Sequence, residues 1–294
     1  DVAPPCPKSV KIELTARCDF KCFFCATGSK LRDRADMDFD LLCRLLADMR
    51  AAGVEEIGMF YLGESFLYKR LPEAIAYASE LGYPYIFLTT NGRMATPDRV
   101  RACIEAGLDS LKFSFNAASP EQCKDITGID AFDRIVGHIE QTRRVRDEVE
   151  AETGHRCGIY ASSIKYDGEQ QARMDRAVEL IRPHVDTHYW LPLYGQAGLT
   201  AGVRGTTPVA GNVGRLDAMR DPLPCWAVFT EGHVTYDGKL AACCFDHDGR
   251  FDMGDLTETP FMEAWHSEPF QDLRAANLKQ DVTGTACEQC IAYS

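Results

Sequence analysis

Long hydrophobic runs are absent from this chain of 294 residues, although hydrophobic residues make up 45% of it. No apolar run approaches the roughly 20 residues that a membrane-spanning helix needs. The N-terminal stretch DVAPPCPKSV also lacks the pattern of a secretory signal. We therefore expect a globular protein that acts in the cytoplasm and has no membrane partner.

Positive charge is in the minority, because 32 Lys and Arg residues stand against 44 Asp and Glu residues, for a net charge of −12. Such a surface repels nucleic acid and anionic membranes, and it attracts polycationic ligands. We expect no nucleic-acid partner, and an amino sugar that bears several ammonium groups would suit this balance. Acidic residues also serve simply to solvate a surface.

Cysteine is abundant, with 13 residues. Without a secretory signal we do not expect disulfides, and clustered cysteines in a reducing compartment are typical of metal sites. Five cysteines stand alone in the sequence, and we expect them to be packing residues: Cys6, Cys43, Cys103, Cys123 and Cys157. The others form two groups, one near each end of the chain.

Short apolar stretches alternate with amphipathic ones through the first two thirds of the chain. The pattern predicts strands at 9–15, 55–62, 83–92, 108–115, 157–166 and 185–193. It predicts helices between them at 39–53, 71–82, 96–107, about 130–152, and 168–183. Six such repeats in series indicate an α/β fold with a parallel sheet, which right-handed crossovers could close into a partial barrel or leave open.

The composition and the predicted elements change after the sixth predicted strand. Residues 194–224 are rich in Gly, Pro and Ala and are interpreted as a linker or lid. Residues 225–244 predict a β-hairpin that turns at Asp237-Gly238, followed by a helix at about 260–278 and the sequence CEQC at 287–290. The predicted domains are residues 1–200, the barrel, and residues 201–294, the linker and a small α+β cysteine-bearing domain.

The first cysteine group is Cys18, Cys22 and Cys25, in a C-x3-C-x2-C run that follows the first predicted strand. Three thiolates in a tight loop can hold three irons of a [4Fe–4S] cluster, which leaves one iron open to a small-molecule chelate. The alternative is a structural zinc site. Zinc would want a fourth Cys or His nearby, and none lies close in sequence.

This run resembles the signature of the radical S-adenosylmethionine (SAM) superfamily. Phe24 matches the family's aromatic position, which contacts adenine. The sequence LGES at 62–65 ends the second predicted strand, where the family has a GGE-type motif, although Leu62 replaces the first glycine. The resemblance implies that Glu64 receives the amino group of the methionine moiety.

The sequence FSFN at 113–116 ends the fourth predicted strand. There the family has polar groups for the ribose, which implies this role for Ser114 and Asn116, while Ser162 and Ser163 on the fifth strand are equal candidates. All these residues fall at the carboxyl ends of predicted strands, where parallel barrels build their sites. The resemblance implies a partial (β/α)6 barrel that holds SAM at a [4Fe–4S] cluster.

The second group, Cys225, Cys243, Cys287 and Cys290, offers four thiolates for either zinc or a [4Fe–4S] cluster. Ligand chemistry alone favours zinc slightly. This region, however, is similar to the C-terminal SPASM/Twitch domains of radical SAM enzymes, which hold auxiliary [4Fe–4S] clusters. The cysteines suffice for one cluster, as in the shorter Twitch form.

The adjacent pair Cys243-Cys244 leaves the fourth ligand ambiguous by one residue. We take Cys243 as the ligand because its spacing from Cys225 resembles that in Twitch-type aminocyclitol dehydrogenases. Cys244 is then a free thiol, which could return a hydrogen atom to a substrate carbon radical. Delivery from the face opposite to abstraction would invert that carbon. A packing cysteine is the alternative for Cys244.

The resemblance implies a radical SAM epimerase of an aminoglycoside, served by an external electron donor of the flavodoxin or ferredoxin type. A dehydrogenase of an aminocyclitol alcohol and a peptide epimerase are the alternatives. Only 17 residues precede Cys18, so we expect no leader-binding domain and favour a small molecule over a peptide. An iron–sulfur electron carrier or a zinc-stabilised binding protein would leave Glu64 and the strand-end pattern unexplained.

Overall fold

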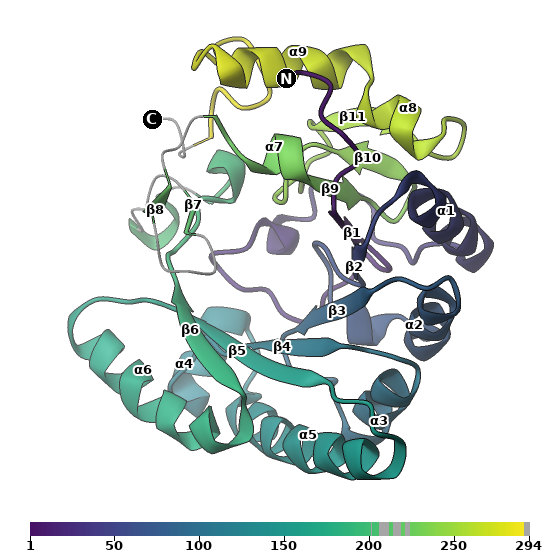
Figure 1. The fold of residues 1–294 in the computed structure, drawn as a ribbon. Coiled ribbons are helices and arrows are strands. Elements are labelled where there is room, and N and C mark those ends of the chain that lie inside the picture. Colours follow the sequence, from purple (N-terminus) through teal and green to yellow (C-terminus); the bar gives the residue numbers. More distant parts are fainter. Residues whose placement is uncertain (201, 206–211, 214–218, 221–223, 291–294) are drawn as a thin grey trace.

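The computed structural model describes residues 1–200, 202–205, 212–213, 219–220 and 224–290. Among these, nine strands form one sheet in the order β11-β10-β9-β1-β2-β3-β4-β5-β6 (Figure 1). Its first six strands in sequence are β1 (Ser9–Ile12), β2 (Glu56–Gly58), β3 (Tyr85–Thr90), β4 (Ser110–Ser114), β5 (Gly158–Ile164) and β6 (Thr187–Leu191). Each pairs in parallel with the next, which confirms the predicted six-stranded partial barrel.

Helices connect these strands and lie along one side of the sheet, as Figure 1 shows for α1, α2, α3, α5 and α6. The helices of the first two thirds are α1 (Phe39–Ala52), α2 (Leu71–Glu80), α3 (Pro97–Glu105), α4 (Pro120–Thr127), α5 (Phe132–Thr153) and α6 (Gly168–Ile181). Neighbouring helices also pack against one another, so that they form a continuous outer layer. The opposite face of the sheet, which we call the lumen face, is left for the site.

Helix α1 illustrates how local sequence sets these elements. The Asp38 carboxylate accepts a hydrogen bond from the Leu41 N–H at 2.9 Å and so caps the N-terminus. Gly53, at φ 109°, ends the helix in the left-handed conformation. The buried residues recur at helical spacing and face the sheet: Leu42, Leu45, Leu46 and Met49.

Two helical regions differ from the prediction. Helix α4 was not predicted, although Ser119 caps it, Pro120 begins it and Gly128 ends it at φ 82°. The helix predicted at about 260–278 is two helices, α8 (Phe261–Trp265) and α9 (Glu268–Leu278). Pro269 lies in the first turn of α9 and has no N–H to donate, so one continuous helix through this point is unfavourable.

The C-terminal hairpin is confirmed and is part of the main sheet. Strands β9 (Glu231–Val234) and β10 (Lys239–Ala241) pair antiparallel, and Gly238 takes φ 84° in the turn. The hairpin begins after a helical turn, α7 (Ala227–Thr230), and β11 (Asp252–Asp255) completes the edge. Because β9 pairs in parallel with β1, the C-terminal region extends the barrel sheet.

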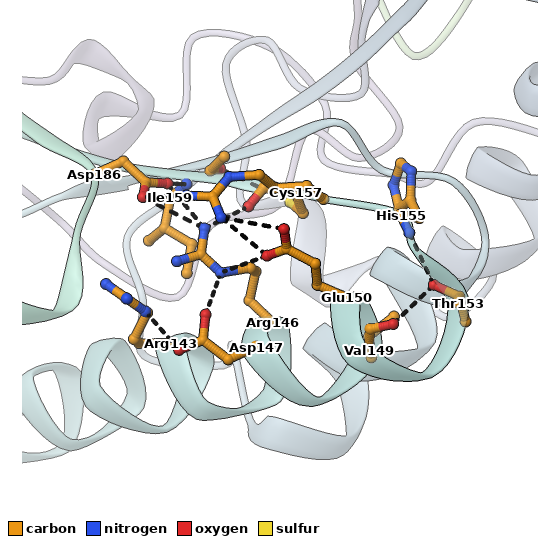
Figure 2. A network of polar contacts seen from close by, with 12 residues as sticks. Arg143, Arg146, Asp147, Val149, Glu150, Thr153, His155, Cys157, Ile159 and Asp186 are labelled. Carbon is orange, nitrogen blue, oxygen red and sulfur yellow. Dashed lines mark hydrogen bonds and ion pairs between the residues drawn. The ribbon is translucent and has the colours of Figure 1, made fainter.

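A buried ion-pair network ties α5 to the sheet (Figure 2). The Arg146 guanidinium donates to the Cys157 carbonyl oxygen at 3.1 Å and to the Asp186 carboxylate at 3.0 Å. It also donates to Asp147 at 2.7 Å, and Asp186 accepts the Ile159 N–H at 2.7 Å. The network therefore joins one helix to the starts of β5 and β6.

The predicted linker or lid at 194–224 lies partly outside the described residues. Its described parts include the short turns η4 (Gln196–Gly198) and η5 (Val203–Gly205) and the strands β7 (Asn212–Val213) and β8 (Met219–Arg220). The domain boundary at residues 200 and 201 stays a prediction. Among the described helices, none has both the length and the apolar character needed to cross a membrane.

Candidate functional site

The first cysteine loop follows β1 and rests on helix α4. The Lys21 N–H donates to the Thr127 carbonyl oxygen at 2.8 Å, and the Phe23 N–H donates to the Ile126 carbonyl oxygen at 3.1 Å. The loop then turns through a bond from the Cys25 N–H to the Cys22 carbonyl oxygen at 3.0 Å. The unpredicted helix α4 thus supports the backbone that presents the thiols.

The three thiols of this loop lie close enough to affect one another. Burial raises the pKa of Cys18 to about 12, and the charges of Glu64 and Cys25 contribute to the increase. Burial also raises the pKa of Cys22 well above its usual range, and the charges of Cys25 and Cys18 add to this effect. Three partly buried thiolates side by side would repel one another, so the loop favours a positively charged partner.

The motif at 62–65 packs directly against this loop. The Glu64 N–H donates to the Arg17 carbonyl oxygen at 2.8 Å. A Cβ atom on Gly63 would lie 2.0 Å from the Thr15 carbonyl oxygen, so this position accepts only glycine. Leu62 is buried, and its carbonyl oxygen accepts the Thr27 hydroxyl at 2.9 Å. The departure from the family motif therefore falls at a position where the structure accommodates a side chain.

The Glu64 carboxylate is buried beside the first cysteine loop. It accepts hydrogen bonds from the Thr90 hydroxyl at 2.8 Å and from the Asn91 N–H at 2.7 Å. Burial raises its pKa to about 7, against the opposing effect of these donors. The Asn91 amide in turn donates to Asp19, within the cysteine loop, at 2.8 Å. Glu64 thus lies where its charge acts on Cys18.

The polar residues predicted on β4 and β5 separate by sheet face. Ser114 pairs in register with Ser162, and paired residues in a sheet share a face. Ser163 points to the other face, where its hydroxyl donates to the Phe115 carbonyl oxygen and lies 2.9 Å from Nε2 of His188. Ser162, and not Ser163, therefore lies on the same sheet face as Ser114.

Two other predicted residues lie near these strand ends and the cysteine loop. The amide oxygen of Asn116 accepts the Ile164 N–H at 3.0 Å, which fixes its side chain between β4 and β5. Phe24 packs edge-to-face on Phe23, with ring centroids 5.3 Å apart. Asn116 is thus held by the fold beyond the carboxyl end of β4, while Phe24 projects from the loop itself.

The four cysteines of the second group come from three places in the C-terminal region, because Cys287 and Cys290 share one turn. Burial raises the pKa of Cys287 to about 12, and the charges of Cys225 and Cys290 raise it further. The charge of Cys290 also raises the pKa of Cys243. The Cys290 N–H donates to the Cys287 carbonyl oxygen at 2.9 Å. The fold therefore assembles these cysteines, which span more than sixty positions of the sequence.

The adjacent residues Cys243 and Cys244 have different neighbours. A hydrogen bond between the two thiols raises the pKa of Cys243 and lowers that of Cys244. Cys243 lies near Cys290, whereas Cys244 lies near Lys11 of β1 and Glu231 of β9, whose charges act on its pKa. Lys11 and Glu231 form an ion pair between neighbouring strands.

Two functional candidates were missed by sequence reasoning. The Tyr61 hydroxyl donates to the Cys243 carbonyl oxygen, and its oxygen lies 3.4 Å from the Asp246 N–H, which donates to it. The imidazole of His247 lies 3.2 Å from the Thr27 hydroxyl, through Nδ1. Nothing in local sequence distinguishes a tyrosine after a strand, or a histidine four residues beyond a cysteine, from ordinary packing residues.

An iron–sulfur cluster fits both cysteine groups by the chemistry of the donors. Among the described residues, no three or more His, Cys, Asp or Glu side chains surround the position of a single metal ion, so the fit rests on the donor set. One loop supplies three thiols, and the C-terminal region supplies four, of which Cys287 is buried and the others are partly buried. Thiolates are the ligands that such clusters take.

Solved structures resemble this fold. BtrN in complex with AdoMet and 2-DOIA matches with a TM-score of 0.59 and 16% identity, over 92% of this chain and 87% of that one. Streptococcus suis SuiB bound to the precursor peptide SuiA matches with a TM-score of 0.69 and 16% identity, over 98% of this chain and 70% of that one. At these identities the likeness shows the fold alone.

Curated relatives include a probable GTP 3′,8-cyclase of Saccharolobus solfataricus, which is 32% identical over 133 residues. That match covers 45% of this chain and 42% of the relative, so the chain spans less than half the length of this relative. A probable GTP 3′,8-cyclase of Metallosphaera sedula is 24% identical over 281 residues, which cover 84% of this chain and 83% of the relative.

Two family models match the chain itself. Residues 225–291 match SPASM, an iron–sulfur cluster-binding domain, which favours iron–sulfur over zinc at the second group. Residues 12–184, more than half of the chain, match the radical SAM superfamily. The protein therefore belongs to the radical SAM superfamily: it is an enzyme that uses SAM at a [4Fe–4S] cluster and carries an auxiliary iron–sulfur cluster in a C-terminal SPASM domain.

Proposed function

We propose that this enzyme is an epimerase of aminoglycoside antibiotic biosynthesis, which inverts C5‴ of neomycin C to give neomycin B. In this proposal, SAM and its reduced cluster, when bound, supply a 5′-deoxyadenosyl radical that abstracts the substrate hydrogen. The ligands of that cluster are Cys18, Cys22 and Cys25, and those of the auxiliary cluster are Cys225, Cys243, Cys287 and Cys290. Members of this superfamily need a reductant, and we expect an external flavodoxin or ferredoxin to supply it.

The chain's own residues position SAM in this proposal. Phe24 contacts the adenine, Glu64 receives the amino group of the methionine moiety, and Ser114 and Asn116 bind the ribose. The burial of Glu64 beside Cys18 supports its role, because its carboxylate already acts on the cysteine loop. A buried carboxylate without a cation is unfavourable, and the ammonium group of the methionine moiety of SAM would relieve this cost.

The different surroundings of Cys243 and Cys244 carry the proposal. Cys243 lies near Cys290, as a ligand of the same cluster would, whereas Cys244 lies near the ion pair of Lys11 and Glu231. Lys11 pairs in register with Gly58, and a Cβ on Gly58 would touch both Lys11 and the ring of Phe87. Lys11 therefore lies on the same sheet face as the ring of Phe87. Val10 lies on the opposite face, where it packs beside Gly232 and toward α8.

Cys244 would then return hydrogen to the substrate inside the barrel. Its S–H bond breaks homolytically and a new C–H bond forms at the substrate carbon radical, on the face opposite to abstraction. The thiyl radical left on Cys244 takes up one electron, from the external donor, and one proton to become a thiol again. The net charge of −12 supports a polycationic amino sugar as the substrate.

The experiment is anaerobic turnover of neomycin C in deuterated water, with SAM and a reductant. The thiol proton exchanges with solvent, so we expect one deuterium at C5‴ with inverted configuration. Cys244→Ala should form 5′-deoxyadenosine without inversion. Cys43→Ala is the matched control, because Cys43 lies on α1, away from both cysteine groups, and it should behave as wild type.

Other outcomes would replace the proposal. An oxidised product with Cys244 dispensable would indicate a dehydrogenase of an aminocyclitol, which is the alternative that the likeness to BtrN in complex with 2-DOIA favours. In that reaction a cluster held by the second cysteine group would serve as the acceptor of one electron from the substrate radical, while a base removes a hydroxyl proton. Inversion of a residue in a peptide, with neomycin C unchanged, would indicate a peptide epimerase.

A further inference from the structure

The two cysteine regions of this protein are joined at residues 61–64. On one side this segment holds the first cysteine loop, because the Leu62 carbonyl oxygen accepts the Thr27 hydroxyl at 2.9 Å. The Glu64 N–H donates to the Arg17 carbonyl oxygen at 2.8 Å. Thr27 lies two residues beyond Cys25 and Arg17 lies one residue before Cys18, so both ends of the loop are fixed.

On its other side the same segment holds the turn that contains Cys243 and Cys244. The Tyr61 hydroxyl donates to the Cys243 carbonyl oxygen and accepts the Asp246 N–H at 3.4 Å. One phenol oxygen therefore closes the turn from residue 243 to residue 246.

His247 makes a second link between the same two regions. Its Nδ1 lies 3.2 Å from the Thr27 hydroxyl, and its Nε2 lies 2.7 Å from the Gln196 amide oxygen. Burial lowers the pKa of His247 to about 3, so the ring stays neutral. With a neutral ring whose Nε2–H donates to Gln196, Nδ1 can only accept, so the Leu62 carbonyl oxygen and Nδ1 share the one hydroxyl hydrogen of Thr27.

We propose that Tyr61 and His247 are positioning residues, which hold the turn at 243–246, and with it the Cys244 thiol, in a fixed place relative to the first cysteine loop. The inference rests on the proposed role of Cys244 as hydrogen donor. Hydrogen return requires near-contact between the thiol and the substrate carbon, and a displacement of about 1 Å in such a step can cost on the order of 10²-fold. Two links from different elements restrain the turn in more than one direction.

The first test measures amide hydrogen exchange on the anaerobic, cluster-loaded enzyme. Tyr61→Phe removes only the hydroxyl, and we expect exchange in the segment 243–250 to rise about fivefold, because one hydrogen bond is lost there. Tyr83→Phe is the matched control, since its hydroxyl also donates to a backbone carbonyl, that of Leu46 at 2.7 Å, away from this turn. Unchanged exchange at 243–250 in Tyr61→Phe would overturn the proposal.

The second test measures inverted product per 5′-deoxyadenosine formed. We expect this ratio to fall about fivefold to tenfold in Tyr61→Phe and in His247→Ala, because the substrate radical forms but meets a displaced thiol. His247→Gln, which can still reach Thr27, should recover part of the ratio. An equal loss of product and 5′-deoxyadenosine would indicate a general structural role and would contradict the proposal.

The two tests also separate this inference from the proposed function. If wild type does not invert neomycin C, the proposed function fails, and with it the role of Cys244. Hydrogen exchange then decides by itself whether Tyr61 and His247 hold the turn. If wild type inverts neomycin C and the ratio is unchanged in both variants, the proposed function stands and the positioning role is wrong.

Discussion

The two cysteine regions of this enzyme are built in different ways. Cys18, Cys22 and Cys25 lie in one loop, and backbone bonds from that loop to α4 hold it in place. Cys225, Cys243, Cys287 and Cys290 come from separate segments of the C-terminal region. The three thiols of the first region come from one local loop, which contacts with α4 hold in place. The cysteines of the second region meet only through the tertiary structure.

Asn277 is a side chain on which the arrangement of the second cysteine region depends. This buried residue of α9 accepts the Cys225 N–H at 3.1 Å through its amide oxygen. Its amide nitrogen donates to the Leu273 carbonyl oxygen at 2.9 Å, and a hydrogen bond to it lowers the pKa of Cys287. One helix therefore orients two cysteines that lie far apart in the sequence. The backbone of the first loop is held instead by backbone bonds to α4.

The largest expected loss of activity comes from two single variants, each of which removes one cysteine from one of the regions. Cys22→Ser should abolish 5′-deoxyadenosine formation, because the cluster that binds SAM is lost. Cys287→Ser should keep 5′-deoxyadenosine formation and lose turnover to product. Chromatography of 5′-deoxyadenosine and product checks both. Loss of SAM cleavage in Cys287→Ser would show that the two regions do not work separately.

A smaller loss of function is expected from Gly63→Ala, which adds a methyl group where residues 62–65 pack against the first cysteine loop. Its Cβ would lie 2.0 Å from the Thr15 carbonyl oxygen, so the backbone must move. We expect a loss of about 3 kcal/mol in unfolding free energy, together with weaker SAM binding. Gly137→Ala is the control, because a Cβ there meets nothing within 4 Å. Denaturant unfolding and SAM titration give the measurement, and equal stability of the two variants would contradict the close contact.

Asn277→Ala tests the tertiary support of the second region. It leaves the partly buried Cys225 N–H without this acceptor, at a cost of about 1 kcal/mol in unfolding free energy. We expect iron content after anaerobic reconstitution to fall from about eight toward about four per chain, with SAM cleavage retained. Gln271→Ala, on the same helix, is the control and should keep its iron. Full iron content in Asn277→Ala would mean that the cysteines alone assemble this site.

The smallest expected effect on stability is a pH dependence at His188, on the edge strand β6. Burial lowers the pKa of His188 from 6.5 to about 4, so the folded state prefers the neutral ring. The stability that His188 contributes is therefore complete above pH 6.5 and is lost as pH falls from 6.5 toward about 4. Because the ring is partly exposed, solvent screening limits the effect to below about 1 kcal/mol.

Thermal unfolding of wild type and His188→Gln between pH 4 and 7 checks this prediction. The difference in stability between the two should shrink as pH falls through this window. A difference that is constant across the window would show that His188 does not titrate differently on folding. Both cysteine regions should keep their iron in this variant, which supplies the baseline for the other comparisons.

Sequence alone determined the alternating strands and helices of the barrel and the cysteine loop after β1. Apolar periodicity and helix caps are local signals, as Asp38 and Gly53 show at the two ends of α1. Helix α4 escaped prediction because it is only eight residues long, too short for a clear amphipathic pattern. Its own signals, a capping serine before proline and a terminal glycine, are weak alone.

Only the tertiary structure decided which residues meet. The register of β4 and β5 selected Ser162 over Ser163, because a shift of one residue turns a side chain to the other face. The parallel pairing of β9 with β1 brought Lys11 near Cys244, and the fold of residues 61–64 brought Tyr61 to Cys243. These contacts join segments about 180 or more positions apart. Local sequence patterns carry no signal of such contacts, because they form only when the sheet and its connections have closed.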